Sequence, residues 1–370
     1  MQFIDLKQQY DLIKDKINES ISNVINEASF IQGKEVKELE DNLRDYVGAK
    51  CITCANGTDA LLIALRALGV KAGDEIIVPS FTWVSTAEVV KLLDAIPVFA
   101  EVDASFNIET LGIKKLISTK TKGIIAVSMF GSCADLNNLK SITEENNIFL
   151  IEDAAQSFGA KHNNMMSCSI ADVSTTSFFP AKPLGCFGDG GAIFTNNNEL
   201  ADKINAISKH GQKGRYNYVT IGMNSRLDTI QAAVLIEKFK IFENEIFLRN
   251  KVASKYNELL SNISEITAPI LPDNDNRSVW AQYTIILNSS KHKAKRAEIM
   301  DLLKSDGIPT ALYYPAPIHL QKPYLGSIKV NLPFTENLSN SVLSLPMHPY
   351  LKIKDQEKIA RSLSRILKNI

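Results

Sequence analysis

The sequence predicts an α/β protein with two domains: a large domain on a mixed, mostly parallel sheet, and a smaller C-terminal α+β domain. Short apolar runs alternate with helical patterns from residue 51 to residue 209, which is the rhythm of βαβ units. Beyond this region the alternation stops. The length of 370 residues also exceeds one ordinary core and favours two domains.

Two amphipathic helices are expected before the first strand. After a first turn at residues 3–6, apolar side chains that include Leu12, Ile17 and Val24 recur at helical spacing. A second helix is expected at 36–47. Gly48 can end it, because glycine readily adopts the left-handed conformation of a helix C-terminus.

The alternating region is expected to form the large sheet. Its strands are predicted at 51–55, 75–79, 97–102, 121–127, 148–152, 173–178 and 192–195, and its helices at 58–68, 86–93, 136–146 and 200–209. Such sheets bind ligands beyond the carboxyl ends of their strands. Asn56, Trp83, Asp153 and Lys182 all follow predicted strands, so the functional site is expected there.

The rest of the chain is organised differently. Residues 210–224 are polar and indicate a long surface loop, and loops of this length are usually functional or mobile. A long helical pattern follows, and we place the domain boundary inside it, which gives domains at 1–238 and 239–370. The helical pattern covers 229–256, and the small domain is expected to contain strands at 282–287 and 310–314 and helices at 293–306 and 355–368.

Composition limits the possible functions. Lys and Arg total 41, as do Asp and Glu, and zero net charge argues against binding nucleic acid or an anionic membrane through overall charge. No run of 18 apolar residues predicts membrane insertion, and no signal peptide is expected. Five cysteines, an odd number, indicate reduced thiols and a cytoplasmic protein. Cys51 and Cys54 lack a second nearby ligand pair, so no metal site is expected.

A lysine between an aromatic strand end and a glycine-rich run is the most informative feature. Lys182 follows Ser177-Phe178-Phe179-Pro180-Ala181 and precedes Gly188-Asp189-Gly190-Gly191. Burial among apolar neighbours lowers the pKa of a lysine, and a neutral amine can form a Schiff base with an aldehyde. The alternative is a buried strand, a turn and an incidental lysine.

Asn56-Gly57-Thr58 lies at a predicted strand-to-helix turn. The first amides of a helix are unpaired and lie at the positive end of the helix dipole, so Gly57 and Thr58 are candidates for binding a phosphate. Alternatively, Thr58 is an ordinary N-cap.

Asp153 and Trp83 suggest how an aromatic ring could be held. A carboxylate that follows a buried strand needs a cationic or donor partner, and a protonated pyridine nitrogen would serve. Gln156, three residues later, could bond a neighbouring ring oxygen, and Trp83 could offer a flat face. The alternatives are a carboxylate that caps the next helix and a core tryptophan. Together, the phosphate site, the aromatic face, the acid and the lysine describe pyridoxal 5'-phosphate chemistry.

Longer motifs give a resemblance that covers essentially the whole chain. The sequence resembles the sugar-nucleotide aminotransferases of the DegT/StrS type, which have the aspartate-aminotransferase (type I) fold. The motifs that carry this resemblance are Asn56-Gly57-Thr58-Asp59-Ala60-Leu61, Glu152-Asp153-Ala154-Ala155-Gln156, Ser177-Phe178-Phe179-Pro180-Ala181-Lys182, Gly188-Asp189-Gly190-Gly191 and Gly222-Met223-Asn224-Ser225-Arg226-Leu227-Asp228.

The resemblance implies a role for each site residue. Lys182 would bind the cofactor covalently, Asp153 would pair with its ring nitrogen, Gln156 would face its hydroxyl and Trp83 would stack on the ring. The phosphate would be bound by Gly57, Thr58 and Ser177. Asn224 would reach the phosphate of a neighbouring subunit and Arg226 the substrate there, so the resemblance implies a homodimer with shared active sites.

The implied reaction moves an amino group from L-glutamate to a nucleotide-linked keto sugar. The family members with the most similar pattern act on UDP-2-acetamido-2-deoxy-3-oxo-D-glucuronate, in the synthesis of bacterial surface polysaccharide such as the O-antigen of lipopolysaccharide. The planar fork of Arg226 suits a C6 carboxylate. Tyr313, Tyr314 and His319 are further candidates for binding substrate, although His319 could equally make ordinary loop hydrogen bonds.

Other substrates and one other class stay open. A dTDP-3-oxo-6-deoxyhexose or a 4-keto UDP-sugar fits much of the same framework. The other class is a regulatory protein that binds pyridoxal phosphate without turnover. The presence of Lys182 argues against the dehydratases of this group, in which histidine replaces the lysine.

Overall fold

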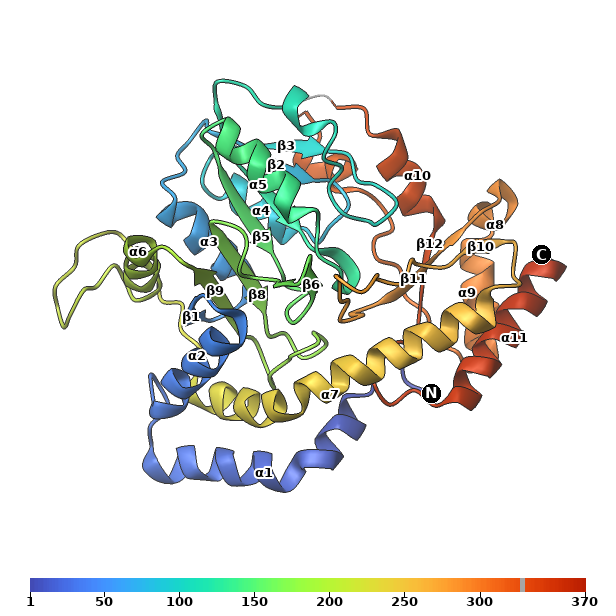
Figure 1. The fold of residues 1–370 in the computed structure, drawn as a ribbon, viewed down its shortest axis with the longest axis horizontal. Helices are drawn as coiled ribbons and strands as arrows, with labels where there is room; N and C mark the ends of the chain where they lie inside the picture. Colours follow the sequence, from blue (N-terminus) through green and yellow to red (C-terminus); the bar gives the residue numbers. More distant parts are fainter. Residues whose placement is uncertain (327–329) are drawn as a thin grey trace.

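A seven-stranded sheet forms the centre of the large domain (Figure 1). The computed structural model describes residues 1–326 and 330–370. The strand order is β1-β9-β8-β5-β4-β2-β3, with parallel pairing from β8 through β5, β4 and β2 to β3, whereas β9 pairs antiparallel with both β1 and β8. The predicted mixed, mostly parallel sheet is therefore confirmed. The strands are β1 (Lys50–Cys54), β2 (Glu75–Pro79), β3 (Ile96–Ala100), β4 (Thr121–Val127), β5 (Phe149–Asp153), β8 (Val173–Ser177) and β9 (Gly191–Thr195).

Helices cover both faces of this sheet, because the side chains on both of its faces are buried. Along β4 and β5, Ile125 and Ile151 pack into one core cluster, whereas Ile124 and Leu150 pack into another on the opposite face. This two-residue period follows from the pleat of a strand. The helices are α2 (Lys34–Val47), α3 (Gly57–Ala67), α4 (Ser85–Lys91), α5 (Leu136–Glu145) and α6 (Asn198–Ser208). Gly48 ends α2 with a φ of 82°, as predicted.

Two long helices lie side by side below the sheet in Figure 1: α1 (Leu6–Glu27) and α7 (Thr229–Leu260). The start of α7 packs into a large-domain cluster that includes Phe242 and Ile246, whereas Val252 and Tyr256 pack into the small-domain core. The helix passes residue 238 without a break, and the domain division proposed there stays a prediction. Within the described residues, no helix has the length and apolar character needed to cross a membrane.

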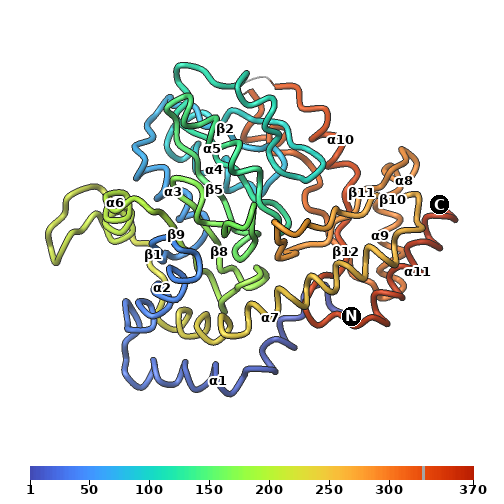
Figure 2. The backbone as a smooth tube through the Cα atoms, viewed as in Figure 1, coloured from blue at the N-terminus to red at the C-terminus, as the bar shows by residue number. Residues whose placement is uncertain are grey.

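The small domain is built on a three-stranded antiparallel sheet of order β10-β11-β12. The first residues of the chain pack against this domain: Met347 N donates a hydrogen bond to Phe3 O at 3.1 Å. The N-terminus therefore lies beside the last third of the chain (Figure 2). The elements are β10 (Ile266–Thr267), β11 (Tyr283–Leu287), α8 (Ser290–Ala294), α9 (Arg296–Ser305), α10 (Pro333–Ser341), β12 (Val342–Leu345) and α11 (Ile353–Asn369).

Two predictions for this domain are corrected by the structure, one for a strand and one for the start of a helix. The strand expected at 310–314 is reduced to one bridge between Ala311 and Ser344, because the next aromatic residues turn toward a cavity. There Tyr313 packs near Phe3, and Tyr314 packs near Phe81 and Trp83. The helix expected at 293–306 is two helices, α8 and α9, with a break at Lys295, where φ is −100° and ψ is 14°.

A buried histidine is expected to make the free energy of unfolding depend on pH. His348 is 4% exposed, and burial lowers its pKa from 6.5 to about 4. Because the unfolded chain then binds the additional proton between pH 6.5 and about 4, stability falls as the pH is lowered through this window. From pH 7 to pH 5 the His348 contribution should fall by about 2 kcal/mol.

Urea unfolding at both pH values measures this effect. His348→Gln should lose about 2 kcal/mol less than wild type on acidification, whereas His210→Gln, at an exposed histidine, should lose as much as wild type. Equal losses in His348→Gln and wild type would show that another group causes the acid sensitivity.

Candidate active site

A cavity of about 430 Å³ lies where several strands of the large sheet end. Residues that follow β1, β2, β5 and β8 form its walls, together with a segment of the small domain. Nine of the predicted site residues line it, which places the motifs together as the topology of a parallel sheet requires. These nine are Gly57, Thr58, Trp83, Asp153, Gln156, Ser177, Lys182, Tyr313 and Tyr314.

One end of the cavity is the N-terminus of α3. Asn56 is its N-cap, and Asn56 Oδ1 accepts from Asp59 N at 2.8 Å, so Thr58 is not the cap. The amides of the first turn have no intrahelical acceptors and favour an anion. A Cβ on Gly57 would lie 2.8 Å from Ser177 Cβ, so glycine is required for the close approach of α3 to the end of β8.

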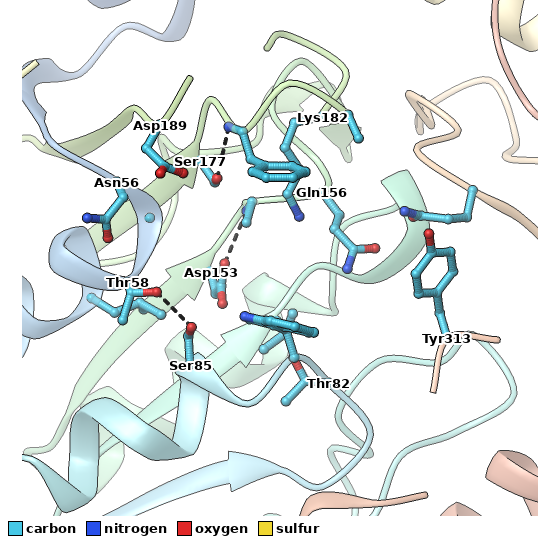
Figure 3. Close-up of a pocket in the computed structure, with 18 of the residues that line it drawn as sticks. Asn56, Thr58, Thr82, Ser85, Asp153, Gln156, Ser177, Lys182, Asp189 and Tyr313 are labelled. Atoms are coloured by element: carbon cyan, nitrogen blue, oxygen red, sulfur yellow. Dashed lines mark hydrogen bonds between the residues drawn. The ribbon is translucent and has the colours of Figure 1, made fainter. Parts of the chain in front are cut away.

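Hydroxyl groups extend this anion-binding end. Thr58 Oγ1 and Ser85 Oγ are 2.7 Å apart, and Ser177 Oγ accepts from Phe179 N at 3.2 Å (Figure 3). Ser85 begins α4 and lines the same cavity, although no motif in the sequence distinguishes it. Backbone amides and hydroxyl groups around one pocket are donors suited to a phosphate.

Asp153 presents a buried carboxylate at the end of β5. It is 7% exposed; Oδ1 accepts from Ala155 N at 3.1 Å, and Oδ2 accepts from Thr86 Oγ1 at 3.3 Å. Burial raises the pKa of this carboxyl, and these donors and the charge of Lys182 partly oppose the effect. A turn rather than a helix follows Asp153, so it does not cap a helix. A protonated ring nitrogen would supply the cation that such a carboxylate favours.

Lys182 lies on the loop between β8 and β9. Its backbone N donates to Phe179 O at 2.8 Å, and Lys238 from α7 donates through Nζ to Gly185 O at 2.7 Å, which fixes the other end of the loop. Burial lowers the pKa of Lys182, and the nearby charge of Asp153 partly opposes this shift. The lowered pKa increases the fraction of neutral, nucleophilic amine.

Trp83 and Gln156 line the same cavity as Asp153. Trp83 is 59% exposed, which excludes the alternative of a core tryptophan and leaves its ring open to the cavity. Gln156 Oε1 accepts from Phe130 N at 3.0 Å, and Nε2 donates to Tyr314 OH at 3.2 Å. The contact of Gln156 with a ring hydroxyl stays a prediction, since one N–H of Nε2 is still available for it.

Three predicted site residues do not line this cavity. His319 is buried, with Nδ1 at 2.7 Å from Ser80 Oγ and Nε2 at 3.2 Å from Glu336 Oε1, so it makes loop hydrogen bonds. Asn224 is exposed, and its backbone pairs with that of Lys209 in an isolated β-bridge. Arg226 follows Asn224 by two residues in the sequence. Their location outside their own subunit's cavity is compatible with a role in a neighbouring subunit, and that role stays a prediction.

Together, these features fit one cofactor. An anion pocket at a helix N-terminus, a buried carboxylate and a lysine of lowered pKa face one cavity, as the phosphate, ring nitrogen and aldehyde of pyridoxal phosphate require. The fold and site thus define a pyridoxal-phosphate enzyme of the type I fold.

The comparisons identify the family. Residues 11–364 match the model of the DegT/DnrJ/EryC1/StrS aminotransferase family, and the chain belongs to this family. It is 48% identical over 366 residues to the UDP-2-acetamido-2-deoxy-3-oxo-D-glucuronate aminotransferase of Pseudomonas aeruginosa, covering 98% of this chain and 99% of the relative.

Solved structures agree with this assignment. A DegT/DnrJ/EryC1/StrS aminotransferase from Brucella abortus has a TM-score of 0.92 and 44% identity, covering 99% of both chains. NtdA from Bacillus subtilis, solved with bound cofactor PMP, has a TM-score of 0.89 and 30% identity, covering 96% of this chain and 82% of that chain. The protein is therefore an aminotransferase, and its cofactor is pyridoxal 5'-phosphate.

Proposed function

We propose that this aminotransferase moves the amino group of L-glutamate to the 3-keto carbon of UDP-2-acetamido-2-deoxy-3-oxo-D-glucuronate. The observation that carries the proposal is the 48% identity, over nearly the full length of both chains, to an enzyme named for this substrate. The amino sugar would serve bacterial surface polysaccharide, such as the O-antigen of lipopolysaccharide, and the enzyme would act in the cytoplasm.

Six residues of the cavity have a specific role in this proposal. When bound, the cofactor supplies an electron-accepting ring next to the amino group being transferred. Asp153 holds a proton on the ring nitrogen, and Gly57, Thr58 and Ser177 bind the phosphate. Trp83 covers one face of the ring. The neutral amine of Lys182 accepts the proton from Cα of the amino acid and later returns a proton to the sugar carbon.

The proposed enzyme is a homodimer with shared active sites. The segment that follows α6 extends away from the rest of the molecule at the left of Figure 1, and Asn224 lies where it returns, paired with Lys209 in an isolated β-bridge. Arg226 follows two residues later. In the proposed dimer this segment would bring Asn224 to the phosphate of the second subunit and Arg226 to the substrate carboxylate. A bidentate arginine–carboxylate pair is stronger and more specific than a neutral contact.

Two substrates that differ only at C6 test this function. The cofactor-loaded protein should lose its visible absorbance on addition of glutamate, and it should then aminate the 3-oxo-uronate faster than the C6 alcohol. Arg226→Ala should lower kcat/KM for the uronate by roughly 10- to 100-fold, because it removes hydrogen bonds to a charged group. The alcohol should be little affected.

Arg215→Ala is the matched control, since Arg215 is an exposed arginine on the same segment. Equal losses with both sugars would refute the carboxylate role of Arg226. Glutamate-dependent bleaching with turnover of only a dTDP-3-oxo-6-deoxyhexose or a 4-keto UDP-sugar would instead identify one of the alternative substrates. Absorbance that ignores glutamate would favour a regulatory protein.

A further inference from the structure

Gln282 places an unpaired carbonyl oxygen in the wall of the active-site cavity. The residue lies immediately before β11, and Oε1 is sealed from solvent without a donor among residues 1–326 and 330–370. A buried acceptor without a donor costs about 1–3 kcal/mol, and native structures rarely leave one unpaired. The oxygen therefore marks a place where a donor of a bound ligand is expected.

The backbone around Gln282 is held on both sides, so only the side chain of this residue can turn toward a donor. Val279 N donates to Gly131 O at 2.9 Å, and a Cβ on Gly131 would lie only 2.4 Å from Trp280 N. On the other side, Tyr283 is paired with Leu345 in the small sheet. Gly131 also follows Phe130, which donates to Gln156, so Gln282 is fixed relative to the cofactor-facing wall.

Among the reactants of the proposed function, the chemistry singles out the sugar as the source of the donor. The protonated ring nitrogen of the cofactor is assigned to Asp153 and its ring hydroxyl to Gln156, and its phosphate mainly accepts hydrogen bonds. Glutamate has two carboxylates, which only accept at neutral pH, and its amine is the group transferred. The hydroxyl groups and amide N–H of the sugar nucleotide remain.

We propose that Gln282 is a specificity-determining residue whose Oε1 accepts a hydrogen bond from a hydroxyl or amide N–H on the sugar of the substrate. The inference rests on the proposed function and extends it. In the proposed substrate, the amide N–H is on C2, next to the carbon that receives the amino group. A hydroxyl elsewhere on the ring is the other source, and the two sources are separable by experiment.

The test compares Gln282→Met, which removes the acceptor at similar volume, with Gln282→Glu, which keeps an acceptor oxygen. In the cofactor-loaded enzyme, Gln282→Met should lower kcat/KM for the keto sugar by roughly 10- to 100-fold, because the sugar donor is left unpaired. It should weaken calorimetric binding of the 3-amino product by a similar factor. The glutamate half-reaction should change by less than about 2-fold, and Gln282→Glu should retain more sugar binding than Gln282→Met.

A substrate with a hydroxyl in place of the acetamido group identifies the source of the donor. If the N–H is the donor, Gln282→Met loses its effect on sugars that lack this group; if a ring hydroxyl is the donor, the effect persists. Gln321→Met, at an exposed glutamine, controls for the substitution itself. Thermal unfolding confirms that each variant is folded.

Three outcomes would overturn the role of Gln282: unchanged sugar binding in Gln282→Met, equal losses in both half-reactions, or a Gln282→Glu variant no better than Gln282→Met. A wild-type enzyme that bleaches with glutamate but aminates no 3-oxo sugar would contradict the proposed function instead. Product binding still measures the Gln282 contact in that case, so the two failures are distinguishable.

Discussion

Lys182→Ala is expected to abolish both turnover and the covalent bond between the protein and its cofactor. Lys182 lies in the cavity next to Asp153, and burial lowers its pKa, so its neutral amine is available for bond formation and proton transfer. Losing the proton-transfer group alone costs roughly 100- to 10,000-fold in rate, and the lost attachment should reduce turnover further. Borohydride reduction followed by peptide mass spectrometry measures the attachment directly.

Lys238 is the matched control for this experiment. Lys238 is buried, and burial lowers its pKa to about 8, but its Nζ donates to Gly185 O, and the residue does not line the cavity. Lys238→Met should therefore keep the covalent cofactor, with a modest loss of activity because the Lys182 loop is held less firmly. Cofactor that remained covalently bound to Lys182→Ala would reject the assignment of Lys182.

Lys182→Ala also tests the proposal that each active site is shared between two subunits. A Lys182→Ala chain retains Arg226, and an Arg226→Ala chain retains Lys182. In a mixed dimer with shared sites, one of the two sites combines the intact residues from both chains. Co-expression should therefore restore about a quarter of the wild-type sites if subunits pair at random. Activity no greater than the sum of the separate variants would contradict a site built from two subunits.

The sequence predicted which residues gather at the cavity, because most of them follow strand ends. Gly57, Asp153 and Lys182 each come directly after, or within a few residues of, an apolar strand, and parallel topology brings such positions to one edge of a sheet. The positions of the strands need only local patterns, whereas their order and the antiparallel placement of β9 between β1 and β8 depend on pairing between distant segments. The strands of the large sheet could therefore be anticipated without tertiary information, whereas their order could not.

Residues whose role depends on distant contacts escaped prediction. The sequence left two roles open for His319, substrate binding and ordinary loop hydrogen bonds, and its contacts with Ser80 and Glu336 favour the second. Gln282 precedes a strand of the small sheet, and nothing in the local sequence shows that it lines the active-site cavity. Lys238 looks like one more residue of a long helix, although it holds a carbonyl of the Lys182 loop. No sequence period encodes such contacts between separate elements.

Asp153→Asn is expected to have the second-largest effect, a loss of roughly 100- to 1,000-fold in kcat with the cofactor still covalently attached. An amide cannot hold a proton on the ring nitrogen as a carboxylate does, so electron withdrawal by the ring weakens. The phosphate end and Lys182 are unchanged in this variant. The cofactor should therefore bind, and both half-reactions should slow.

A second measurement on Asp153→Asn tests whether the charge of Asp153 acts on Lys182. The charge of Asp153 raises the pKa of Lys182 against the larger effect of burial, so its removal should lower that pKa further. In the cofactor-free protein, labelling of Lys182 by an amine reagent should then reach its half-maximal rate at a lower pH than in wild type. An unchanged or higher midpoint would show that the two side chains are not electrostatically coupled.

The neighbouring carboxylate supplies the control. Glu152 is fully buried and accepts from Ser128 Oγ at 2.9 Å, Ser167 Oγ at 2.7 Å and Cys168 N at 2.7 Å, but it does not line the cavity. Glu152→Gln would turn an amide N–H₂ toward these donors and should destabilise the fold by about 1–3 kcal/mol. Its labelling midpoint for Lys182 should stay close to that of wild type. The pair of variants therefore distinguishes a carboxylate that acts on the reaction from one that holds the end of β5 in place.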